Sequence, residues 1–292
     1  MTPLETVNQA MLSGLSTDGL TADINRTQPL YHYTSAEGLL GILRSQELHA
    51  SNYAFMNDTT EMVYGANLAR PILSEEFGKQ HGLTGKILKR ALEIIAATRG
   101  MDIFIFSLCE HPDVLSQWRG YGSAASRYAI GFDRQQLIGM SQKAIVPLRV
   151  IYDSSAQEEK VRHFCASVAS ILATSDLPDE AEIVDKVAIM IAIRFFHLLP
   201  LLKNKGFQEE CEWRLVVTTY EQPTVMDFVV RGGMLRPFFP IRADSTITSL
   251  PIREVIVGYS PHPDRAVRSV EMLLKHYGHN VPVSITNIPF TE

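Results

Sequence analysis

Charged and apolar side chains alternate from Glu210 to Arg214, and an apolar run follows them. In a β-strand this alternation puts Glu210, Glu212 and Arg214 on one face, because successive side chains point to opposite sides. Two neighbouring carboxylates raise the pKa of one of the pair, which suits a general base. The positive charge beside them leaves a second interpretation open, in which Arg214 neutralises the pair as a structural ion network.

A second polar segment lies near the beginning of the chain, from Tyr31 to Thr34. Strand alternation directs His32 and Thr34 to one face and the tyrosines, Tyr31 and Tyr33, to the other. The polar pair either bonds to neighbouring backbone while the tyrosines fill the core, or it faces a site. We expect this segment to lie opposite the Glu210–Arg214 stretch.

Ser107 and the sequence QWRGYG at 117–122 are two further candidates. Ser107 ends an apolar run, so its hydroxyl either bonds to backbone in the core or reaches a cleft at the strand end. Trp118, Arg119 and Tyr121 lie among glycines. They form either a stacking wall for a planar ligand or an anchor that holds the loop.

The elements that position these residues are helices and strands without a steady βαβ alternation. We expect helices at 60–79, 84–99, 155–172, 180–202 and 263–276, and shorter ones near residue 4, after residue 35 and within 112–122. We expect strands at 29–33, 48–53, 103–108, 128–132, 145–151, 212–219, 225–230, 252–257 and 281–285. The mixed order predicts an α+β fold.

The 292 residues are expected to form a single domain. An N-terminal helix and lead-in occupy 1–28. The motif-bearing core covers 29–220 and contains a helical insert at 155–202, and C-terminal strands and a helix cover 221–292.

Composition is that of a folded globular protein, with 46% apolar and 20% charged residues. The net charge of -5 gives no reason to expect broad binding to nucleic acid and leaves only a local basic patch open. Three distant cysteines indicate a reducing compartment. The N-terminus lacks a secretory pattern, and the most apolar segment, 187–202, is too short to span a bilayer. We therefore expect a cytoplasmic protein that does not enter membranes.

Several common chemistries have no motif in this chain. It has no G-x-x-x-x-G-K-[ST] phosphate loop, no G-x-G-x-x-G after a strand and no G-x-S-x-G nucleophile elbow. His, Cys, Asp and Glu do not recur at the spacings of metal ligands, so we expect no metal site.

The order HYTS, MNDTTE, FSL, WRGYG, GFD and ExEWRLV, from His32 to about Val216, resembles an uncharacterised bacterial domain family of unknown function. The same pattern is similar, more distantly, to the ADP-ribosyltransferase superfamily. That resemblance implies a split, mostly antiparallel sheet of ADP-ribosyltransferase-like type with added helices. It also implies NAD as the substrate.

The resemblance to ADP-ribosyltransferases implies a role for each candidate. His32, with Thr34 beside it, matches the first-strand motif that bonds the ribose hydroxyls of NAD, and Ser107 matches a middle-strand serine on the nicotinamide side. Glu212 matches the catalytic glutamate, and Glu210 matches the residue that helps to activate an acceptor. The remaining residues assigned to the cofactor site are Tyr33, Trp118, Arg119 and Tyr121.

Cleavage of the nicotinamide–ribose bond develops positive charge on the ribose, and a nearby carboxylate stabilises it. The favoured interpretation is therefore an NAD-dependent ADP-ribosyltransferase or NAD-cleaving enzyme, acting as a bacterial toxin or defence effector. The acceptor is left open and includes a macromolecule. Two alternatives stay open: a non-catalytic module that senses a nucleotide, and a metal-dependent hydrolase or nuclease that uses His32 with the two glutamates. The oligomeric state is not specified by the sequence.

Overall fold

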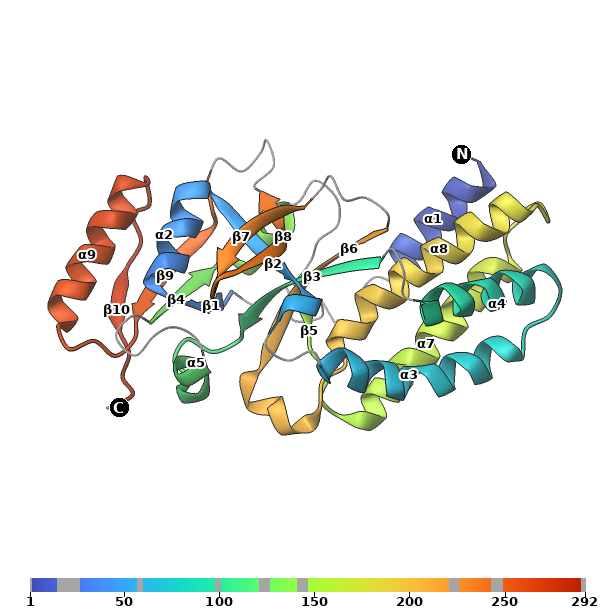
Figure 1. Ribbon diagram of the computed structural model, residues 1–292, viewed down its shortest axis with the longest axis horizontal. Coiled ribbons are helices and arrows are strands. Elements are labelled where there is room, and N and C mark those ends of the chain that lie inside the picture. Colours follow the sequence, from blue (N-terminus) through green and yellow to red (C-terminus); the bar gives the residue numbers. More distant parts are fainter. Residues whose placement is uncertain are drawn as a thin grey trace.

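The computed structural model describes residues 2–14, 27–56, 60–97, 101–120, 127–140, 147–220, 226–242 and 249–289. The molecule is elongated (Figure 1), with a bundle of helices at one end, a sheet in the middle, and α2 (Ala36–Ser45) and α9 (Pro263–His276) at the other end. The fold is α+β, as the mixed order of elements predicts.

The sheet is mostly antiparallel, and its strands follow the order β10-β9-β4-β1-β3-β2-β8-β7, with β6 and β5 branching from β3. The one parallel pair in the described part is β9 with β10. The strands are β1 (Leu30–Thr34), β2 (Glu47–Asn52), β3 (Met101–Cys109), β4 (Tyr128–Phe132), β5 (Leu148–Arg149), β6 (Glu212–Tyr220), β7 (Asp227–Arg231), β8 (Met234–Arg242), β9 (Ile252–Val257) and β10 (Val283–Ile285).

The sheet forks at β3. One edge of β3 pairs with β6 along its whole length, from Met101 to Cys109. The other edge is shared: β2 pairs with it at Phe104 and Ile105, and β1 pairs with it at Cys109. Ser107 lies between these two pairings, at the point where β1 and β2 separate. The mostly antiparallel pairing agrees with the expectation, whereas the ADP-ribosyltransferase-like type of the sheet stays a prediction.

Helices cover the two ends of the sheet differently. Leu39, Ile42 and Leu43 of α2 are buried with Val270 and Leu274 of α9 in the core that covers β1, β4 and β9. The helices of the other end share one large apolar core with the beginning of β3. They are α1 (Pro3–Gly14), α3 (Thr60–Gly78), α4 (Gly82–Ala97), α7 (Ser154–Ala173) and α8 (Ala181–Leu198).

The helices expected within 155–202 are present as α7 and α8, followed by a 3-10 helix, η2 (Leu199–Leu201). They do not pack alone, because α1, α3 and α4 complete the same core. Elements that bear on the site are the short helix α5 (Leu115–Gly120) and the 3-10 helices η1 (Tyr53–Phe55) and η3 (Lys205–Glu210). A further short helix, α6 (Arg134–Gly139), follows β4.

Strand β8 is absent from the sequence-based expectation, because it contains Pro237 and Pro240, and proline removes a ladder donor. The register explains how the sheet accepts both. Pro237 lies opposite β7 but beyond the end of the β2 ladder, which stops at Phe238. Pro240 lies opposite β2 but beyond the end of the β7 ladder. Each proline therefore has a neighbouring strand on one side only.

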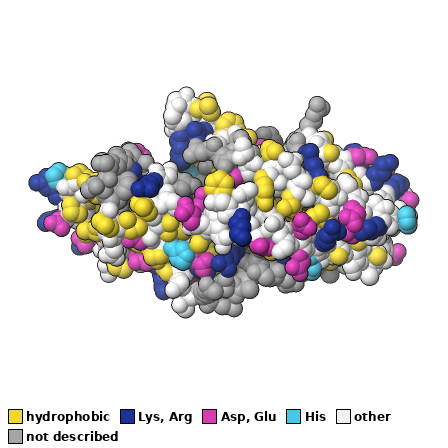
Figure 2. Space-filling model, turned by 90° about the horizontal axis from the view of Figure 1, so that it is seen from below, with side chains coloured by type: hydrophobic (Ala, Val, Ile, Leu, Met, Phe, Trp, Pro, Cys, Tyr) yellow, Lys and Arg dark blue, Asp and Glu magenta, His cyan; other side chains and the backbone are white. Residues whose placement is uncertain are grey.

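Charge is mixed over the helical end of the molecule. Lys, Arg, Asp and Glu side chains are interspersed there on the face drawn in Figure 2. Several of them pair on the surface, among them Arg162 with Glu75 and Glu76. None of the described helices has the length and apolar character needed to cross a membrane.

Candidate functional site

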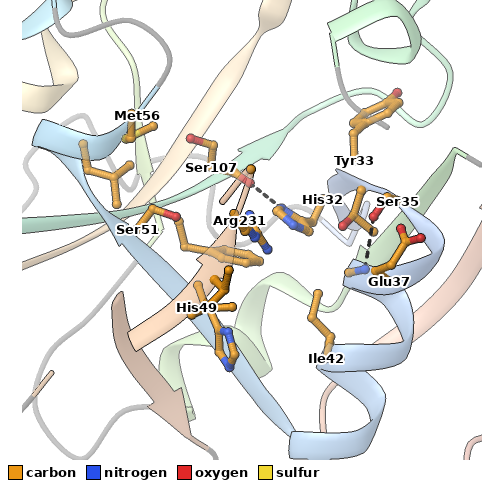
Figure 3. Close-up of a pocket in the computed structure, with 18 residues that line it drawn as sticks. His32, Tyr33, Ser35, Glu37, Ile42, His49, Ser51, Met56, Ser107 and Arg231 are labelled. Carbon is orange, nitrogen blue, oxygen red and sulfur yellow. Dashed lines mark hydrogen bonds between the residues drawn. The ribbon is translucent and has the colours of Figure 1, made fainter. Parts of the chain in front are cut away.

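A pocket of about 590 Å³ opens at the fork of the sheet (Figure 3), a volume typical of small-molecule sites. Side chains from β1, α2, β2, β3 and β7 surround it. The polar lining consists of His32, Thr34, Ser35, Glu37, His49, Ser51, Ser107 and Arg231. Ile42, Met56, Ile105, Phe106, Val229 and Val230 supply apolar surface.

His32 is held in one orientation against β3. Its Nδ1 lies 2.9 Å from the backbone oxygen of Ser107, and its ring stacks on Phe106 with centroids 4.3 Å apart. Burial lowers the pKa of His32 to about 4; the bond to Ser107 opposes this shift and the charge of Arg231 adds to it. The ring is therefore neutral near pH 7, with Nδ1–H donating to the carbonyl and Nε2 left as an acceptor.

A second, smaller space of about 30 Å³ adjoins this pocket and reaches the acidic residues. His32, Tyr33 and Ser107 line both spaces, and Glu210 and Glu212 line only the smaller one. The structure thus places the histidine, the serine and both glutamates of the sequence-based site around two adjoining spaces.

Glu212 belongs to a group of five charged residues, here called the Lys203 cluster: Glu61, Lys203, Glu210, Glu212 and Arg214. Of these, Lys203, Glu212 and Arg214 are buried. Arg214 bonds Glu212 in bidentate fashion, with Nε–Oε1 2.8 Å and Nη2–Oε2 2.7 Å. The Lys203 ammonium lies 2.8, 2.6 and 2.9 Å from carboxylate oxygens of Glu61, Glu210 and Glu212. The side chains of Lys203 and Arg214 are 4% and 2% exposed, so both cations depend on these partners.

The two glutamates of the cluster differ in their ionisation. Burial alone raises the pKa of Glu212, but the charges of Arg214 and Lys203 and the bonds from Arg214 outweigh it and hold that pKa at about 2. The pKa of Glu210 is raised, because burial outweighs its bond to Lys203. Glu210 is also the more accessible of the two, with 24% of its side chain exposed against 7%.

The expectation of one strand face is correct for Glu212 and Arg214 and wrong for Glu210. Glu210 ends the 3-10 helix η3, and β6 begins two residues later. Cys211 between them has a left-handed backbone with φ of 43°, which breaks the strand alternation. Lys203 still brings the two carboxylates together, because its ammonium bonds both.

The Ser107 hydroxyl interacts with Glu212 and helps to lower the pKa of that carboxyl group. It forms no well-oriented hydrogen bond with a described residue. Ser107 also faces Arg214 across the β3–β6 ladder. A buried hydroxyl of this kind is available to a ligand. Thr34 lines the same pocket, where α2 approaches β1 so closely that a Cβ on Gly38 would lie 2.0 Å from Thr34 Oγ1.

The aromatic candidates have a structural role in the described part of the chain. Trp118 is 2% exposed, donates from Nε1 to Asp113 and packs edge-on against Tyr33 at 4.7 Å. The Tyr33 hydroxyl donates to the His111 carbonyl at 3.0 Å. These contacts favour the loop-anchor interpretation of Trp118.

The two remaining cofactor-site residues of the WRGYG motif, Arg119 and Tyr121, stand differently. Arg119 is exposed at the end of α5 and is not among the described residues that line either space. Tyr121 lies outside the described residues.

Sequence reasoning missed Lys203 and Arg231 as site residues and treated Glu61 only as part of a helix start. Lys203 lies seven positions before Glu210, in the short connection between η2 and η3, so no periodic pattern includes it. Arg231 enters the pocket from a hairpin whose second strand was not expected. Glu61 carried the one available signal, because it falls within the MNDTTE motif.

Residues 117–215 match a protein family of unknown function, DUF2971. The match runs from α5 to β6, so it contains the WR motif, Lys203, both glutamates and Arg214. It confirms the resemblance to a family of unknown function over these residues and carries no link to ADP-ribosyltransferases. The chain matches no curated protein and no solved structure.

Among the described residues, no three His, Cys, Asp or Glu side chains are arranged as metal ligands. The three carboxylates of the Lys203 cluster are bonded to an ammonium group instead.

Substitution of Arg214 by methionine should destabilise the protein strongly, because it removes the bidentate partner of the buried Glu212 and leaves three carboxylates around the single cation Lys203. We expect a loss of about 3–5 kcal/mol in the free energy of unfolding, measured by urea denaturation. Arg162→Met is the matched control, since Arg162 forms exposed pairs and should cost less than about 1 kcal/mol. Equal losses in the two variants would contradict the structural importance of the cluster.

Acidification should reduce stability through His32. Its pKa is 6.5 when unperturbed and about 4 in the folded chain, so the unfolded state binds a proton first. The contribution of the neutral His32 to the free energy of unfolding is complete above pH 6.5. As the pH falls towards 4, the free energy of unfolding decreases by roughly 2–3 kcal/mol. In His32→Gln the unfolding free energy should depend less steeply on pH in this window. The exposed His163→Gln should keep the wild-type slope.

Proposed function

We propose that the protein binds NAD in the pocket at the fork and cleaves its nicotinamide–ribose bond, passing the ADP-ribose to water or to an acceptor. One observation carries this proposal: His32 and Ser107 line both the large pocket and the recess that reaches Glu210 and Glu212. We expect a nucleotide in the pocket to direct its reactive bond towards this recess and its acidic residues.

The polar lining suits a dinucleotide. The neutral His32 offers Nε2 as an acceptor for a ribose hydroxyl, and the Ser107 hydroxyl, which lies near Glu212, also lines the pocket. Arg231 brings a positive charge to the pocket and forms no ion pair with a described residue, which favours a phosphate-bearing ligand.

The Lys203 cluster supports a division of labour between the glutamates. Three carboxylates and two cations leave one net negative charge when all five groups are ionised, and this charge stabilises the positive charge that develops on the ribose. Glu212 supplies the fixed negative charge. Glu210, with its raised pKa and greater exposure, accepts the proton from the attacking water or acceptor.

A second candidate is a module that binds a nucleotide without turning it over. One observation favours it: Glu212 is 5% exposed and bonded to both Arg214 and Lys203, which is the pattern of a structural ion network. A ligand-dependent rise in the melting temperature without loss of NAD would identify this function.

Replacement of Glu210 by glutamine should lower the rate of NAD cleavage by about 10²- to 10⁴-fold and leave NAD binding intact. The measurements are nicotinamide release and the NAD-dependent thermal shift of the purified protein. Glu209→Gln is the control, because Glu209 is an exposed neighbour outside the lining of both spaces. If the wild type releases no nicotinamide and transfers nothing to candidate acceptors, the catalytic proposal fails.

Two further variants separate binding from catalysis. His32→Ala should abolish the NAD-dependent thermal shift, since it removes the acceptor in the pocket. Glu212→Gln should abolish turnover, and its melting temperature without ligand shows whether the cluster remains intact. A Glu212→Gln protein that is folded and fully active would contradict the assigned role of this residue.

A further inference from the structure

Strand β7 forms the end of the sheet and has a neighbour on one side only. It pairs with β8, and no described strand pairs with its outer edge. The backbone groups of such an edge can pair with another chain unless the strand blocks them. The five residues of β7, DFVVR, contain neither proline nor lysine, the residues that commonly block an edge.

The turn between β7 and β8 determines which backbone groups of β7 point outwards. The two glycines after Arg231 have φ of +59° and +74°, as in a two-residue hairpin turn, and Arg231 lies opposite Met234. Residues that flank such a turn bond to each other, and the bonding direction alternates along the strand. Phe228 and Val230 therefore direct their N–H and C=O groups away from β8.

The same hairpin exposes apolar side chains. Phe228, Val230 and Leu235 are 57%, 67% and 64% exposed. Val230 lies opposite Leu235, and alternation puts Phe228 on the same face. This is the face on which Leu48 and Ala50 of β2 are buried in the core, so the apolar surface of the sheet continues uncovered onto the hairpin.

The opposite face of β7 carries two charges that are not paired within the described part of the chain. Asp227 and Arg231 form no ion pair with a described residue. They are four residues apart on one strand, and a separation of roughly 13 Å prevents them from pairing with each other. Asp227 accepts a hydrogen bond from the next backbone N–H, that of Phe228, at 2.7 Å.

We propose that the chain self-associates through β7, with two copies of the strand paired antiparallel about Val229. In this register Asp227 lies opposite the partner's Arg231, and Phe228 lies opposite the partner's Val230. The outward backbone groups of Phe228 and Val230 then meet their counterparts, and the Phe228 N–H exchanges its bond to Asp227 for one to the partner.

A second copy is the occupant that the sequence of the strand favours. DFVVR is complementary to itself about its centre, with opposite charges at the ends and apolar residues between them. Two-fold symmetry repeats each contact, so one register forms both charge pairs and both apolar pairs. The partner's Asp227 also lies beside Arg231 at the mouth of the pocket.

Charge exchange on β7 tests the register. In Asp227→Arg both symmetric pairs become repulsive, and we expect the dimer dissociation constant to rise roughly 10- to 100-fold. Arg231→Asp should have the same effect, and the double variant Asp227→Arg/Arg231→Asp should return the constant to near the wild-type value. Sedimentation velocity over a range of concentrations, without nucleotide, measures all three.

Arg265→Asp is the control, because it makes the same charge change at an exposed position of α9 and should leave the dimer intact. A wild-type chain that stays monomeric at every concentration overturns the proposal. A double variant as weak as the single variants overturns the register. Since no ligand is present, these results do not depend on whether the protein binds or cleaves NAD.

Discussion

The bidentate pair of Arg214 and Glu212 is the interaction on which the geometry of the site depends. A guanidinium that is 2% exposed requires carboxylates around it, and these come from α3 and β6. Arg214 also donates from Nη1 to the Pro200 carbonyl at 2.5 Å, which ties η2 to the sheet. Arg214 therefore links the helical end of the molecule to the strands beside the fork, in addition to the apolar core that they share.

The fork follows from the unequal edges of β3. Because β6 occupies one edge along its full length, β1 and β2 share the other, and they separate around Ser107. The Ser107 carbonyl, which lies between these two pairings, bonds the Nδ1 of His32. The same bond fixes the tautomer of His32 and leaves Nε2 as an acceptor. The sheet topology thus determines the orientation and the tautomer of His32 in the pocket.

Local patterns in the sequence predicted most elements, because alternation and helix caps are local properties. They predicted the polar face of His32 and Thr34, and they placed Glu212 and Arg214 on one strand face, with their ion pair as one of two open interpretations. They failed for Glu210, since the left-handed Cys211 interrupts the alternation. Lys203 was not predictable in this way, because its three carboxylate partners come from separate elements and meet only in the folded chain.

The Lys203 cluster gives the two neighbouring glutamates, Glu210 and Glu212, different pKa values. Without other charges nearby, one of two adjacent carboxylates would have a raised pKa. Here the cations neutralise the two unequally. Glu212, bonded by both cations, has a pKa of about 2, and the pKa of Glu210 is raised. A carboxylate with so low a pKa is a weak base near neutral pH and acts best as a fixed charge. In the proposed cleavage of NAD, Glu210 is then the residue suited to proton transfer. Its position on η3, outside the strand, gives it the exposure that this role requires.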